Sequence, residues 1–134
     1  MSERSTHWLR FAEEDLNSAK ILLREGIYNK VCFHSQQCAE NSLKALLVFR
    51  HKNPPKTHSL IELLRLVAKL HKDFQCFEES CRRLDQFYLP TRYADALVGT
   101  LPQGLPTEEH AREAVESAES LLSSVNEATR TKDS

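Results

Sequence analysis

The stretch that decides the fold is residues 31–48, VCFHSQQCAENSLKALLV. On an α-helix, which turns by about 100° per residue, its apolar and small side chains cover more than half of the circumference. A helix that packs against one neighbour needs a narrower apolar stripe, so we expect this helix to lie at the centre of a bundle. Small residues line one side, where another helix can approach closely: Ser35, Cys38, Ser42 and Ala45.

The remaining arc of this central helix is polar and carries Gln37, Glu40, Asn41 and Lys44. Glu40 and Lys44 are four residues apart, the spacing at which opposite charges pair along a helix. The simplest interpretation of these two residues is an ion pair exposed to solvent.

The composition favours one all-helical domain over residues 1–134, because glycines and β-branched residues are few and helix-forming residues abound. The 18 basic and 19 acidic residues give a net charge of −1, so no overall field attracts nucleic acid and a polyanion site would have to be local. The sequence has no transmembrane-length apolar run, no signal-peptide-like start and no C-x-x-C pair among its four cysteines. We therefore expect a cytoplasmic protein with reduced cysteines in or beside its core, and no metal or other cofactor.

An N-terminal helix is expected from Ser5 or Thr6 to about Arg24, with Gly26 ending it. Asp15 falls in the middle of its apolar face, and a buried carboxylate needs a partner. We expect a tyrosine, an arginine or backbone amides of a neighbouring helix to donate hydrogen bonds to Asp15. The apolar face consists of Trp8, Phe11, Ala12, Leu16, Ala19, Leu22 and Leu23.

Pro54 and Pro55 stop the central helix. Ser59 and Glu62 have the spacing of a capping box, which predicts the start of a third helix. Asp73 is the predicted cap of a fourth. The expected buried face of the third helix is Leu60, Ile61, Leu63, Leu64, Val67 and Leu70, and that of the fourth is Phe74, Phe77, Cys81, Leu84 and Tyr88.

Residues 99–106, GTLPQGLP, are rich in glycine and proline and predict a loop. Thr107 then caps a last helix, and we expect a frayed tail from about residue 129. The apolar face of this helix is Ala111, Ala114, Val115, Ala118, Leu121, Leu122 and Val125.

Several of these blocks resemble the HEPN domain family (higher eukaryotes and prokaryotes nucleotide-binding). The similar segments are WLRFAEEDLNSAK at 8–20, FHSQQCAENSLKALL at 33–47, PPKTHSLIELL at 54–64 and TRYAD at 91–95. The resemblance implies an up-and-down bundle of four to five α-helices that is usually a homodimer. It implies either the partner of a minimal nucleotidyltransferase in a toxin–antitoxin-type pair or a metal-independent ribonuclease.

The ribonuclease members of the family use an R-x(4–6)-H motif, and by resemblance its arginine is Arg92. No histidine follows Arg92 until His110, so we expect no catalytic residues of this type. Arg65 and His71 match the same string, but they lie in another block of the family pattern, and we interpret that match as chance.

Eight residues are candidates for binding a nucleotide, a phosphate or a protein partner, because basic groups suit phosphate and a tyrosine face can stack on a base. They are Gln37, Glu40, Lys44, Lys56, His58, Arg92, Tyr93 and Asp95. A simpler interpretation, which we favour, is a solvated Glu40–Lys44 pair and a local Arg92–Asp95 salt bridge. His34 and Cys38 have a spacing that can hold a metal, but two ligands alone do not make a site.

The sequence therefore leads to a non-catalytic, dimeric HEPN-like protein that binds a minimal nucleotidyltransferase, a nucleotide, or both. Two alternatives stay open at this point. One is a ribonuclease toxin with a degenerate site, and the other is a dimerisation or scaffold module.

Overall fold

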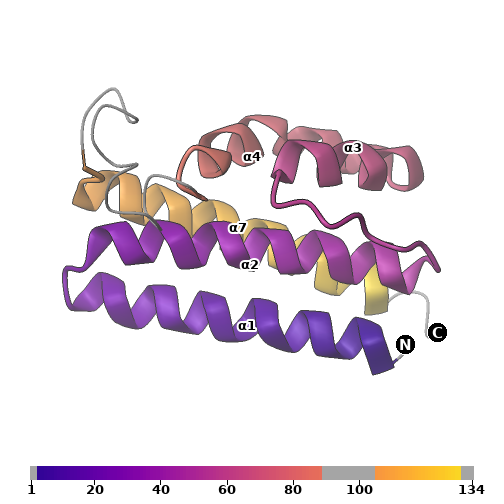
Figure 1. Cartoon of the computed structure of the whole chain (residues 1–134), viewed down its shortest axis with the longest axis horizontal. Helices are drawn as coiled ribbons and strands as arrows, with labels where there is room; N and C mark the ends of the chain where they lie inside the picture. Colours follow the sequence, from indigo (N-terminus) through magenta and orange to yellow (C-terminus); the bar gives the residue numbers. More distant parts are fainter. Residues whose placement is uncertain (1–2, 89–104, 131–134) are drawn as a thin grey trace.

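The computed structural model describes residues 3–88 and 105–130, and these ranges hold helices and no strand. The predicted all-α helical bundle is confirmed. Figure 1 shows α1 on one side of α2, and α3 and α4 on the other. The elements are α1 (Glu3–Arg24), α2 (Tyr28–Phe49), α3 (Leu60–Leu70), the 3-10 helix η1 (Lys72–Phe77), α4 (Glu78–Asp85) and α7 (Glu108–Arg130).

The centre of the bundle is α2, as its wide apolar arc predicted. It packs against α1, α3, α4 and α7, and 14 of its 22 residues are buried. Ser42 lies inside this helix and donates a hydrogen bond to the Cys38 carbonyl at 2.8 Å, so its buried hydroxyl is satisfied locally. The small residues of this side therefore permit close helix packing without leaving the Ser42 hydroxyl unpaired.

The segment between α2 and α3, residues 50–59, runs back along α2 (Figure 1). His58 near its end is hydrogen-bonded to Gln36 and Glu40, which belong to the first half and middle of α2. The two prolines at 54 and 55 stop α2 as predicted, but the return of the chain along α2 was not predicted. This return decides where the candidate site lies.

Three predicted helix boundaries are confirmed by their contacts. Ser59 accepts a hydrogen bond from the Glu62 backbone amide at 3.2 Å, and Thr107 accepts one from the His110 amide at 3.3 Å. Gly26 ends α1 with a φ of +76°, a left-handed conformation that glycine adopts without strain.

Other local predictions are wrong. The α1 helix begins at Glu3, before Ser5, and Phe11 is 54% exposed because it lies about 100° round the helix from the buried Ala12. Asp73 does not cap a helix, because it lies inside η1, which begins at Lys72.

The cysteines and the chain end also differ in part from expectation. Cys32, Cys38 and Cys81 are buried and free, but Cys76 is exposed because it lies in η1, where three residues per turn replace the α-helical period. At the other end, α7 continues to Arg130 and its Thr129 is buried. Residues 131–134 lie outside the described residues.

Candidate functional site

Two residues of the polar arc of α2, Glu40 and Lys44, are covered instead of solvated. Glu40 is 4% exposed and Lys44 is 7% exposed, and their charged groups are 3.0 Å apart. The Lys44 ammonium also lies 5.5 Å from the centre of the Trp8 ring, where the ring face attracts a cation. The predicted ion pair is confirmed, but the expectation that it is exposed is wrong, because Trp8 and the returning segment cover it.

His58 is the part of this cluster that reaches solvent. Its Nδ1 lies 3.2 Å from Glu40 Oε1, and because an ionised carboxylate can only accept, Nδ1 is the donor. The His58 side chain is 56% exposed and its ring stacks on Tyr88, with centroids 4.5 Å apart and planes 14° apart. An exposed histidine, stacked on a partly buried tyrosine, is thus held on top of a buried ion pair.

Two glutamines hold the segment around His58 in place. Gln36 is fully buried and donates from Nε2 to the His58 carbonyl at 2.8 Å. Gln37 donates to the Gln36 side-chain oxygen at 2.7 Å and to Glu40 Oε1 at 3.2 Å. Gln36 was not among the residues predicted from the sequence, although a glutamine inside an apolar arc signals a buried hydrogen bond.

Asp15 obtains its predicted partner from α2. Its two carboxylate oxygens each lie 3.0 Å from a side-chain nitrogen, His34 Nδ1 and Asn41 Nδ2 respectively. The prediction that Asp15 needs a partner is confirmed, but the partner is not a tyrosine, an arginine or a backbone amide. His34 is therefore engaged with Asp15, and the described residues contain no cluster of three potential metal ligands.

Asp85 supports the same region from α4. Its carboxylate accepts hydrogen bonds from the backbone amides of Leu60 at 2.7 Å and Ile61 at 3.2 Å, at the start of α3. Burial raises the pKa of Asp85, and the hydrogen bonds from these amides partly offset that effect. No local pattern reveals this contact, since Asp85 lies 25 residues beyond Leu60 in the chain.

Of the eight candidates, the structure brings together Gln37, Glu40, Lys44 and His58. Lys56 is exposed on the same returning segment. Arg92, Tyr93 and Asp95 lie outside the described residues, which end at Tyr88 on this side.

The R-x5-H string on α3 forms no site of its own in the described part of the chain. His71 follows the end of α3, and its Nε2 lies 3.2 Å from Arg50 Nη1. Arg65 is exposed on α3 and lines a different surface, between α3 and η1. His110, the first histidine after Arg92, caps α7 through Thr107.

Comparison with known proteins gives the family. The HEPN domain matches residues 5–128, almost the whole chain. The chain belongs to the HEPN domain family. None of the helices described here has the length and apolar character needed to cross a membrane.

Relatives and solved structures agree with this HEPN assignment. The chain is 28% identical, over 86% of its length and 81% of the other, to the Methanocaldococcus jannaschii protein named "Putative toxin MJ1304". The crystal structure of TT1696 from Thermus thermophilus matches with a TM-score of 0.78 and 34% identity over 94% of this chain and 98% of that one. ST0689, described as an archaeal HEPN homologue, matches with a TM-score of 0.73 and 29% identity, covering 96% and 99% of the two chains.

Proposed function

We propose that this HEPN protein is a non-catalytic, cytoplasmic homodimer that binds a minimal nucleotidyltransferase, a nucleotide, or both, in a toxin–antitoxin-type pair. The observation that carries the proposal is the exposed His58 ring, stacked on the partly buried Tyr88 above the buried Glu40–Lys44 pair. The name of the M. jannaschii relative supports the toxin–antitoxin setting.

The exposed residues of the cluster suit a phosphate-bearing or acidic ligand. Lys56 supplies a positive charge, and the exposed His58 ring can stack on a base. Tyr88 is the last described residue before the segment that carries Arg92, Tyr93 and Asp95, so the described part of the site ends where those candidates begin. We therefore place the contact surface at Lys56, His58 and the segment after Tyr88.

Glu40, Lys44 and Gln37 have a different role in this proposal. Glu40 and Lys44 are too buried to touch a ligand, so they act through His58, which Glu40 holds by its Nδ1. Gln37 is half-buried and holds Glu40 in turn. These three are positioning residues. Replacing any of them should weaken ligand binding, because the His58 side chain would become more mobile.

Binding is tested with ATP and with the nucleotidyltransferase encoded beside this gene, if one is present. We expect saturable ATP binding by calorimetry, or a stable complex in size-exclusion chromatography, that Arg92→Ala and His58→Ala weaken about tenfold or more. Arg82→Ala is the control, because Arg82 is an exposed arginine on α4 that pairs with Glu78. The absence of both ATP binding and a complex, or equal losses in Arg82→Ala, would refute the proposal.

The dimer is tested separately by sedimentation equilibrium at micromolar concentration. Exposed apolar side chains support it, above all Phe11, which is 54% exposed, and Leu105, which is 62% exposed. Leu105 directly follows the undescribed segment that contains Leu97 and Leu101. A monomer mass across the concentration series would contradict this part of the proposal.

A further inference from the structure

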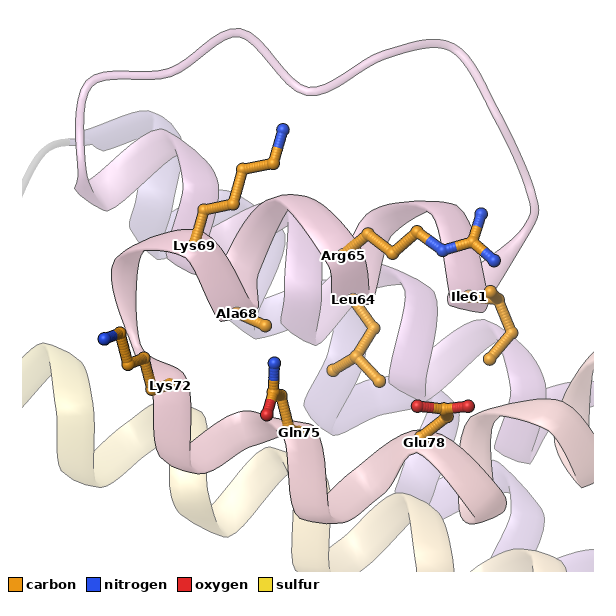
Figure 2. A pocket seen from close by; sticks show the side chains of 8 residues that line it. All are labelled: Ile61, Leu64, Arg65, Ala68, Lys69, Lys72, Gln75 and Glu78. Atoms are coloured by element: carbon orange, nitrogen blue, oxygen red, sulfur yellow. The ribbon is translucent and has the colours of Figure 1, made fainter.

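A groove lies between α3 and the η1–α4 segment, apart from the residues of the proposed site. Its volume is about 440 Å³, and Figure 2 shows its side chains coming from α3 on one wall and from η1 and the start of α4 on the other. Apolar side chains from α3 form its floor: Ile61, Leu64 and Ala68.

The rim of this groove is basic. Arg65, Lys69 and Lys72 are exposed and line it, and no residue of the described ranges forms an ion pair with them. The one acidic lining residue, Glu78, already pairs with Arg82 at 2.8 Å. The groove therefore has an uncompensated positive charge next to an apolar floor.

The segment that precedes the groove and forms its α3 wall is also basic, whereas the η1–α4 wall adds the acidic Asp73, Glu78 and Glu79. Residues 50–72 contain six of the 18 basic residues of the chain and one of the 19 acidic residues, Glu62. The six are Arg50, Lys52, Lys56, Arg65, Lys69 and Lys72. In a protein with a net charge of −1, such a local excess creates a field that selects for a negative partner.

We propose that this groove docks an acidic amphipathic helix of a partner protein. The floor residues Ile61, Leu64 and Ala68 lie along about 10 Å of α3, which matches roughly two turns of a bound helix. Arg65 and Lys69 are four residues apart, about 6 Å along the axis, and so match carboxylates four residues apart on the bound helix.

A nucleic acid fits the groove less well than an acidic helix. None of the eight residues that line it is aromatic, so an unpaired base finds no ring to stack on. The apolar floor would also stay unused by a phosphate backbone. An apolar stripe flanked by carboxylates uses both the floor and the rim.

The test is a selection from a displayed library of helical peptides of about four turns against the full-length protein. We expect the enriched peptides to carry apolar residues on one face with Glu or Asp beside them. In fluorescence anisotropy, their affinity should fall about tenfold in the Arg65→Glu/Lys69→Glu variant, because two attractions become repulsions. The Arg65→Gln/Lys69→Gln variant should lose less affinity than the Glu variant. Ala68→Met should also weaken peptide binding, because the larger side chain fills part of the groove.

The matched control is Arg10→Glu/Lys30→Glu, which makes the same charge change at exposed positions of α1 and α2. This variant should bind the selected peptides like the wild type. Failure to enrich acidic amphipathic peptides, or an equal loss of peptide affinity in the control variant, would overturn the proposal. Tighter, Arg65-dependent binding of a single-stranded oligouridylate would overturn it in favour of RNA. The test is independent of His58 and Arg92, so its failure leaves the proposed function untouched.

Discussion

Removing one partner of the Glu40–Lys44 pair should lower the free energy of unfolding far more than removing both. The two charges are 3.0 Å apart and nearly inaccessible, and their attraction at an effective dielectric constant of about 20 is roughly 5 kcal/mol. The cost of taking both charges out of water largely cancels this attraction. Loss of Lys44 alone leaves a buried, unpaired carboxylate, which typically costs about 3 to 5 kcal/mol.

We expect Lys44→Met to fall near the lower end of that range, about 3 kcal/mol. The Glu40 carboxylate keeps its contacts with His58 and with Gln37, each at 3.2 Å, so part of its hydrogen bonding survives the loss of Lys44. The double variant Glu40→Leu/Lys44→Met should lie within about 1.5 kcal/mol of the wild type, since it buries no unpaired charge.

The assay is urea denaturation followed by circular dichroism, with the free energy of unfolding extrapolated for the wild type, both single variants and the double variant. A total stability of roughly 5 to 15 kcal/mol makes a loss of this size easy to measure. A Lys44→Met cost below about 1 kcal/mol at about pH 8, with an unchanged denaturant slope, would refute the reasoning. A double variant that costs the sum of the two singles would refute it as well.

Four further predictions concern other residues. Ellman's reagent should quickly modify only Cys76 in the folded protein and all four thiols after unfolding, because burial raises the pKa of each of the other three to about 12. The unfolded chain ionises these three thiols near pH 9.0, whereas the folded chain keeps them protonated. The free energy of unfolding, measured by urea titration, should therefore fall as the pH rises from 9.0 towards 12. A free energy of unfolding that stays constant over this range would contradict the prediction. Asp85→Ala should lower the free energy of unfolding by about 1 to 2 kcal/mol, because the backbone amides at the start of α3 lose the carboxylate that accepts their hydrogen bonds. A change within about 0.3 kcal/mol would argue against this capping role of Asp85. Purified protein should leave an RNA transcript intact, since no histidine stands near Arg92 in sequence to move a proton; cleavage that disappears in Arg92→Ala would show a ribonuclease instead.

Local sequence patterns predicted the helices well because helical period and capping are local properties. The apolar arc placed α2 at the centre, and Ser59, Thr107 and Gly26 ended or began helices where expected. Asp15 shows the limit of such patterns. Its burial predicted a partner, but the choice of His34 and Asn41 depends on how α1 and α2 align, which no single helix specifies.

The candidate site was harder to predict because it is made by a contact between distant segments. Pro54 and Pro55 predict the end of α2, but they do not say in which direction the chain continues. Its return along α2 turns an apparently exposed Glu40–Lys44 pair into a buried one. The sequence offered these residues as candidates, and the structure separates the exposed His58 from the buried groups that hold it.

His58 is restrained at three points by two neighbouring elements. Gln36 of α2 binds its carbonyl, Glu40 of α2 binds its Nδ1, and Tyr88 after α4 stacks on its ring. Each restraint reduces the conformational freedom that a ligand would otherwise have to remove, so a site built on His58 loses less entropy on binding. Under the function that we propose, the buried ion pair serves binding without contacting the ligand, because Glu40 fixes the His58 side chain in advance.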